Sequence, residues 1–90
     1  MALLMYGEPL AWTIDYSDTS LRQLKRMDKD TARRILDYMD KRIARSADPR
    51  SHGKALSGVL GDLWRYRVGD YRILCDIQDF QIHILVVQIG

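Results

Sequence analysis

Cysteine is almost absent from this sequence of 90 residues, in which Cys75 is the only one. A single cysteine excludes a disulfide within the chain, so a reducing compartment is expected. No apolar run approaches the roughly 20 residues that a membrane-spanning helix requires. The opening residues, MALLMYGEPLAW, lack the basic start of a signal peptide. We therefore expect a cytoplasmic protein with no membrane partner, in which residues 1–9 are a leader or a disordered segment.

Histidine is scarce too, which bears on metal binding and on catalysis. The only two histidines are His52 and His83, and neither has a cysteine or a second histidine at the spacing of metal ligands. We expect no metal and no cofactor. His83 is interpreted as a surface strand residue paired with Asp76, and Cys75 as a small core residue in preference to a nucleophile.

Positive charge is concentrated in one part of the chain. All fourteen lysines and arginines lie between Arg22 and Arg72, together with only seven of the twelve acidic residues, so this segment carries a net charge of +7. The rest of the chain carries −5. Such asymmetry favours a polyanion or an acidic partner, although a well-solvated helix face would also account for many of the charges.

The first half of the chain predicts a strand and two helices within a single domain of residues 1–90. Apolar and polar residues alternate over residues 11–16, as in a half-buried strand. Ser17 or a neighbouring polar residue can cap a helix that runs to about Met27. A second helix, capped by Asp28 or Asp30, is expected to end near Ala47. Its apolar stripe consists of Ala32, Ile35, Leu36, Met39 and Ile43.

The second half predicts three strands, beginning with a hairpin whose two-residue turn is Gly69-Asp70. That turn predicts the pairs Val68–Tyr71, Arg67–Arg72, Tyr66–Ile73, Arg65–Leu74 and Trp64–Cys75. One face is then apolar, and the other carries three arginines. A second turn at Asp79-Phe80 is expected to place His83 opposite Asp76. The predicted fold is α+β with the order β-α-α-β-β-β, in which a helix hairpin packs on one face of a mostly antiparallel four-stranded sheet.

Arg67 facing Arg72 is an unfavourable arrangement, because like charges opposite each other on paired strands destabilise a sheet. Two explanations remain open. In the first, each guanidinium group extends into water or pairs with Asp62, Asp76 or a terminal carboxylate. Alternatively, the cluster binds phosphate, for which the planar fork of arginine is well suited.

The same residues carry a family resemblance. The run LSGVLGDLWRYRVGDYRILCDI and the later strand ending VVQIG resemble the RelE toxins of the RelE/ParE superfamily. The resemblance covers residues 11–90, and its specific part is the second half of the chain. It implies a RelE-like fold and the toxin component of a type II toxin–antitoxin system. Such toxins are cytoplasmic, metal-independent endoribonucleases that cut messenger RNA in the A site of the 70S ribosome and so inhibit translation.

The resemblance also implies partners and site residues. The implied partner is a RelB-like antitoxin, and DNA is contacted only indirectly, through the antitoxin complex. Arg65 and Arg67 match paired basic positions of the family's active site, and Arg72 matches its arginine after the tyrosine; these three are the predicted catalytic residues. Lys54 lies in a loop where the family also places basic residues. Together with the three arginines it is predicted to bind the substrate.

The sequence departs from the family pattern in two places. Some family members carry lysine where this sequence has Arg65 and Arg67, and arginine is a poor general base because it stays protonated, so no residue is assigned as the general base. The family usually continues after the strand glycine with a basic pair and then a tyrosine, whereas this sequence ends at Gly90. One expectation is therefore a chain that folds and binds antitoxin but cleaves RNA weakly or not at all. The alternatives are a ParE-like toxin that acts on DNA gyrase and a degenerate toxin that only binds antitoxin.

Overall fold

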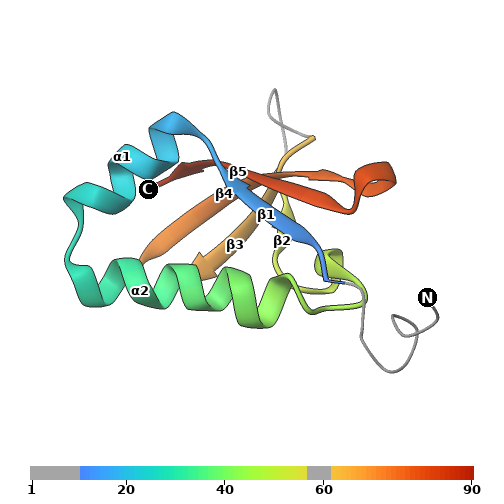
Figure 1. The fold of residues 1–90 in the computed structure, drawn as a ribbon, viewed down its shortest axis with the longest axis horizontal. Helices are drawn as coiled ribbons and strands as arrows, with labels where there is room; N and C mark the ends of the chain where they lie inside the picture. Colours follow the sequence, from blue (N-terminus) through green and yellow to red (C-terminus); the bar gives the residue numbers. More distant parts are fainter. Residues whose placement is uncertain (1–10, 57–61) are drawn as a thin grey trace, which may run out of the picture.

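Two helices pack on one face of a five-stranded sheet in the computed structural model, which describes residues 11–56 and 62–90 (Figure 1). The sheet order is β1-β5-β4-β3-β2, and its strands are β1 (Thr13–Tyr16), β2 (Lys54–Ala55), β3 (Trp64–Val68), β4 (Tyr71–Gln78) and β5 (His83–Ile89). β1 pairs with β5 in parallel, and the other three pairs are antiparallel. The predicted α+β class and the mostly antiparallel sheet are confirmed. The predicted leader, residues 1–9, lies outside the described residues.

Both helices begin at the residues that their sequences favour. In α1 (Asp18–Arg26), the Ser17 hydroxyl accepts a hydrogen bond from the Ser20 amide at 3.0 Å. In α2 (Lys29–Asp37), the Asp28 carboxylate accepts from the amides of Asp30 and Thr31. These bonds satisfy amides that the first helical turn leaves without partners. The helix continues as a π-helical turn (Tyr38–Ile43), which ends before the predicted Ala47. Within the described ranges, no helix has the length and apolar character needed to cross a membrane.

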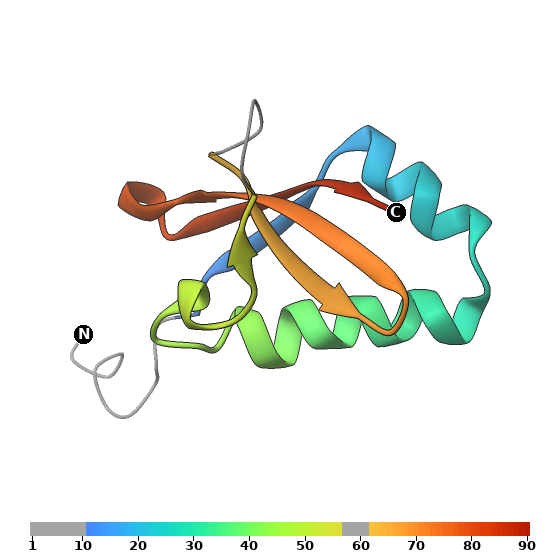
Figure 2. The ribbon, with the colours of Figure 1, turned by 180° about the vertical axis from the view of Figure 1, so that it is seen from behind.

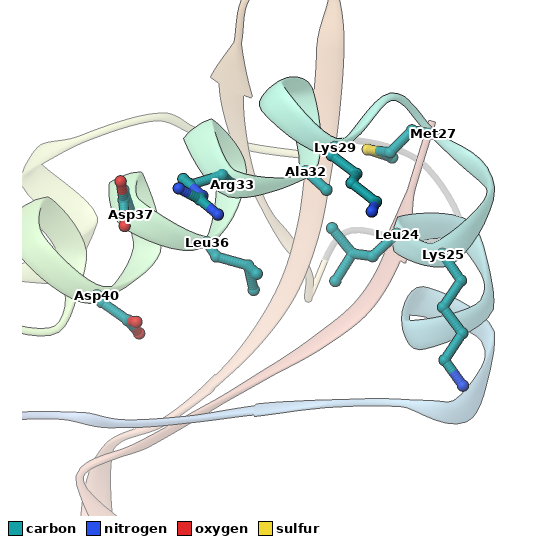
Figure 3. Close-up of a pocket in the computed structure, with 9 residues that line it drawn as sticks. All are labelled: Leu24, Lys25, Met27, Lys29, Ala32, Arg33, Leu36, Asp37 and Asp40. Carbon is teal, nitrogen blue, oxygen red and sulfur yellow. The ribbon is translucent and has the colours of Figure 1, made fainter.

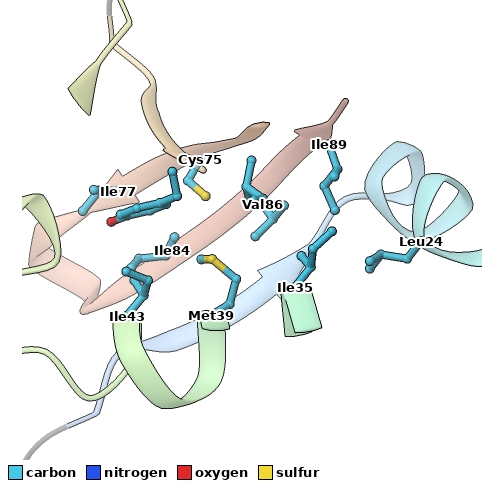
Figure 4. Close-up of a cluster of buried hydrophobic side chains, with 11 residues drawn as sticks. Leu24, Ile35, Met39, Ile43, Cys75, Ile77, Ile84, Val86 and Ile89 are labelled. Atoms are coloured by element: carbon cyan, nitrogen blue, oxygen red, sulfur yellow. The ribbon is translucent and has the colours of Figure 1, made fainter. Parts of the chain in front are cut away.

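The core lies between the second helix and the middle of the sheet. Ile35, Met39 and Ile43 have no exposed surface, as the predicted apolar stripe requires. They face the buried β5 residues Ile84 and Val86, among others of the same cluster (Figure 4). Burying each of these side chains stabilises the fold by roughly 1.5–3 kcal/mol. The long helix formed by α2 and the π-helical turn therefore holds β5 in place, and β5 in turn positions β4 and β1.

The register of the β3–β4 hairpin is confirmed at all five predicted pairs, from Val68–Tyr71 to Trp64–Cys75. Gly69 has φ of +58°, the left-handed conformation that a two-residue hairpin turn needs and that glycine adopts without strain. Tyr66, Ile73 and Cys75 are fully buried on the helix side. The arginines of the same strands consequently lie on the opposite face, which we call the open face.

The predicted pairing of β4 with β5 is wrong by two residues. A 3-10 turn (Asp79–Gln81) followed by Ile82 at φ of 49° replaces the two-residue turn, so Gln78 pairs with His83 and Asp76 with Leu85. A shift of two residues keeps each side chain on its face, which is why the burial pattern still resembles the predicted one. Residues 79–82 thus form a turn longer than the predicted Asp79-Phe80 turn, and this added length accounts for the difference.

The predicted number of four strands is also wrong, because β2 forms a fifth strand at the edge of the sheet beside β3 (Figure 2). β2 is only two residues long, with Lys54 opposite Arg65 and Ala55 opposite Trp64. Two residues are too few to show an alternating pattern, so this segment was predicted as a loop. The added strand places Lys54 directly beside the arginines of β3.

Candidate functional site

β3 presents two different sets of side chains on its two faces. Two of its inward residues are aromatic and hold the preceding loop: Trp64 Nε1 donates to the His52 carbonyl at 2.5 Å, and the Tyr66 hydroxyl donates to the Pro49 carbonyl at 2.7 Å. Its outward residues are Arg65 and Arg67. Successive side chains of β3 point to opposite faces of the sheet. The inward ones therefore fix the loop that leads to Lys54, and the outward ones place two arginines on the open face.

The structure brings the four sequence-predicted site residues together. Lys54 lies opposite Arg65 on β2 and β3, and Arg67 lies opposite Arg72 on β3 and β4, which makes two neighbouring like-charge pairs. No carboxylate of the described residues forms an ion pair with any of the four. The predicted alternative in which Asp62 or Asp76 neutralises the arginines is therefore not observed. Four cations without such partners attract an anion to this part of the surface.

Two adjoining hollows mark the open face beside these cations. The first has a volume of about 440 Å³ and is lined by Gly53, Lys54, Arg65 and Arg67. We call it the cationic hollow. The second has about 430 Å³ and is lined by Leu56, Arg65, Asp70, Arg72, Leu74, Gln88 and Gly90. We call it the leucine hollow. Arg65 lines both, so a single residue borders a compartment with three cationic residues and one that includes two leucines.

Gly53 is a site residue that the sequence analysis missed. Its φ is +74°, and a Cβ atom there would collide with the Arg65 carbonyl oxygen and lie 2.9 Å from Cδ1 of Tyr66. Only glycine lets the loop approach β3 this closely. The available signal was a glycine immediately before Lys54 in a segment rich in turn residues.

His83 and Cys75, which were not predicted to be catalytic, both lie in surroundings that favour a structural role. His83 Nε2 lies 2.6 Å from Asp15 Oδ2, and His83 Nδ1 lies 2.9 Å from Gln78 Oε1. The predicted pairing of His83 with Asp76 is wrong, and Asp76 instead accepts a hydrogen bond from Gln78. Cys75 is fully buried, and this burial raises the pKa of its thiol. Both ring nitrogens of His83 have hydrogen-bonding partners within the protein, and a protonated buried thiol is a poor nucleophile.

A separate groove lies between the helices, away from the open face (Figure 3). It has a volume of about 850 Å³, and its apolar floor includes Leu24 and Leu36. Basic side chains line it at Lys25, Lys29 and Arg33, and acidic ones at Asp37 and Asp40. No group of three metal-ligating side chains occurs in residues 11–56 and 62–90. The groove thus offers an apolar strip with charged edges, suited to a peptide segment.

Replacing Arg67 with glutamine should increase the free energy of unfolding by about 0.5 kcal/mol, because it removes one of two like charges that face each other across β3 and β4. Glutamine keeps most of the length of the side chain while losing the charge. Urea denaturation at low salt measures the gain, which should shrink in 1 M salt, where the screening length is about 3 Å. If Arg67→Gln does not increase the free energy of unfolding at low salt, repulsion between Arg67 and Arg72 does not destabilise the sheet.

A sequence profile of one family matches most of the chain. Residues 14–90 match the family described as ParE toxin of type II toxin–antitoxin system, parDE. No curated protein sequence matches the chain significantly.

Solved structures of several toxins share the fold. The structure of the RelBE2 toxin–antitoxin complex from Mycobacterium tuberculosis matches with a TM-score of 0.83 at 20% identity, over 92% of this chain and 93% of that one. The archaeal RelE–RelB complex from Pyrococcus horikoshii matches at 0.71 and 24% identity, over 89% and 93%. A YoeB/ParE toxin from Agrobacterium tumefaciens matches at 0.69 and 17% identity, over 86% and 94%. These similarities show that the chain shares its fold with these toxins.

Proposed function

The chain belongs to the family of ParE toxins of type II toxin–antitoxin systems, within the RelE/ParE superfamily, and we propose that it is a metal-independent endoribonuclease that cleaves messenger RNA in the ribosomal A site. The observation that carries the proposal is the group of Lys54, Arg65, Arg67 and Arg72, which share one face in two like-charge pairs. The planar fork of arginine is well suited to phosphate, which is why this arrangement favours RNA as the substrate.

The chemistry of RNA cleavage suits these side chains. The 2′-hydroxyl of RNA loses its proton to water as its oxygen attacks the adjacent phosphorus atom, and the phosphorane that forms carries additional negative charge. The bond from phosphorus to the 5′-oxygen then breaks, and the 5′-oxygen takes up a proton from water. Arg65, Arg67 and Arg72 supply fixed positive charge to the phosphorane, and Lys54 binds the phosphate backbone. Because arginine stays protonated, these residues act by electrostatic stabilisation. The ribosome contributes by holding the messenger RNA in position.

A second function is favoured by the family match itself. ParE-type toxins act on DNA gyrase, and the matching profile describes ParE toxins. In that function the cations of the open face would contact gyrase or its DNA without cleaving RNA. The first function predicts cut messenger RNA and the second predicts broken DNA, so one experiment can distinguish them.

The test incubates the purified protein with translating ribosomes and, in parallel, with gyrase and supercoiled plasmid. We expect primer extension to map cuts in the A site, and no cuts in the same messenger RNA without ribosomes. Plasmid breaks together with intact messenger RNA would replace the proposal with the gyrase function. Binding to antitoxin with neither activity would indicate a degenerate toxin that only binds antitoxin.

The groove between α1 and α2 is a candidate binding site for the antitoxin. Toxins of this fold have been solved in complex with RelB antitoxins, and a RelB-like segment that is apolar on one side and acidic at one end would match the leucine floor and the basic edge. Leu36→Glu should weaken antitoxin binding by at least tenfold, since a charge would be buried against apolar surface. Isothermal titration checks this, and unchanged affinity would place the partner elsewhere.

A further inference from the structure

Four side chains form one row across the open face. Lys54 lies opposite Arg65, Arg65 opposite Leu74, and Leu74 opposite Gln88, so the row crosses β2, β3, β4 and β5 in turn. Paired strands are about 4.8 Å apart, so the row spans about 14 Å. Along it the chemistry changes from two cations to an apolar side chain and then to an amide. A nucleotide has the same order, with its phosphate at one end and the polar edge of its base at the other.

A β-bulge places Gln88 at the end of this row. The register of β4 and β5 slips between Cys75, which pairs with Val86, and Leu74, which pairs with Gln88. Val86 is fully buried, and strict alternation would bury residue 88 as well; instead Ile89 is only 2% exposed and Gln88 is on the surface. Bulges often occur next to functional sites, where they redirect a side chain. Here the bulge places Gln88 on the open face, where it lines the leucine hollow.

The leucine hollow has the chemical composition of a nucleobase site. Leu56 and Leu74 provide apolar surface on which a ring can lie, while Arg65 and Arg72 border the same space. The Gln88 amide offers both a donor and an acceptor, which is what reading the edge of a base requires. Its volume of about 430 Å³ lies within the range of about 300–1,000 Å³ that is usual for small-ligand pockets. The adjoining cationic hollow has no leucine in its lining and carries three cationic residues, and so it suits the phosphate better than the base.

We propose that the leucine hollow binds the base of an RNA nucleotide whose phosphate is held by Arg65, and that the Gln88 amide selects which base is accepted. The inference rests on the proposed function, because it makes this site the source of sequence preference in RNA cleavage. It adds a binding compartment and a specificity residue to the cation cluster. Arg65 couples the two compartments, since it lines both of them.

The first test measures binding and needs no catalysis. Each of the four nucleoside 5′-monophosphates is titrated into the isotope-labelled protein and followed by NMR. Shifts are expected at the methyl groups of Leu56 and Leu74 and at the Gln88 side-chain amide, with one base binding at least about fivefold more tightly than the weakest. In Gln88→Leu the four affinities should converge. Inorganic phosphate should shift the arginines and leave both leucines unchanged. Equal shifts from phosphate and nucleotides, or leucine shifts only with an antitoxin peptide, would overturn the inference.

The second test compares cleavage patterns on ribosomes. Gln88→Leu should spread the cuts over more codons, so that the fraction of cuts at the preferred codons falls relative to the wild type. Gln81→Leu is the matched control, because Gln81 is exposed on the distant 3-10 turn, and it should keep the wild-type pattern. Cleavage with an unchanged pattern in Gln88→Leu would overturn the inference and leave the proposed function standing. Selective nucleotide binding without any ribosomal cleavage would support the binding site and overturn the proposed function.

Discussion

Arg65→Ala should reduce ribosome-dependent cleavage of messenger RNA by a factor of about 10² to 10³, the usual effect of removing one group that stabilises a transition-state charge. Arg65 is expected to matter most because it lines both the cationic hollow and the leucine hollow. Arg65→Lys should recover only part of the lost rate, since lysine keeps the charge but not the planar fork. Single-turnover cleavage on ribosomes measures both effects.

Stability distinguishes a catalytic role from a structural one. Arg65 faces Lys54 across β2 and β3, so removing its charge relieves repulsion and should not lower the free energy of unfolding. Arg45→Ala removes an equal charge from an exposed turn outside both hollows, and it should leave cleavage unchanged. If Arg65→Ala were folded and as active as the wild type, the cation cluster would have no part in RNA cleavage.

Gly53→Ala should destabilise the protein by about 2–4 kcal/mol, the combined cost of a left-handed backbone and of a steric clash. The new Cβ would collide with the Arg65 carbonyl and lie 3.1 Å from Trp64 Nε1. The loop must then move away from β3, which weakens the hydrogen bond from Trp64 to the His52 carbonyl. Lys54 moves with the loop, so the cationic hollow widens. Chemical denaturation measures the loss of stability.

Gly69→Ala provides the matched control, because it changes the same kind of residue in the other left-handed turn. Gly69 has φ of +58°, and the nearest atom to its added Cβ is Arg34 Nη2 at 3.7 Å, an ordinary contact. Its cost should therefore be about 1 kcal/mol, from the backbone conformation alone. Equal losses in the two variants would mean that the close approach of Gly53 to Arg65 is unimportant.

The β3–β4 hairpin was predictable because its register depends on local sequence. A Gly-Asp turn between two alternating runs fixes which residues face each other, and the apolar set of Trp64, Tyr66 and Ile73 fixes which face is buried. The grouping of Arg65, Arg67 and Arg72 follows directly from that register. The chemical role of the group depends on substrate contacts and stays a prediction.

The rest of the site depends on features with little local signal. β2 is two residues long, and its partner is chosen by the loop that Trp64 and Tyr66 anchor. Gln88 reaches the open face through a bulge, whereas simple alternation assigns it to the core. His83 finds Asp15 on a strand near the other end of the sequence. Each of these arrangements results from tertiary packing, which a pattern read along one segment does not contain.

The parallel pairing of β1 with β5 has a consequence for how the protein is made. Thr13 pairs with His83 and Tyr16 with Val86, so the first strand of the sheet has no partner until β5 has been synthesised. The long helix also buries Ile35 and Met39 against β5. Contacts between residues so far apart in sequence form slowly, because a long loop must close first. A chain still emerging from the ribosome therefore cannot complete this sheet, and we expect the cation cluster to acquire its final geometry only after translation has passed residue 89.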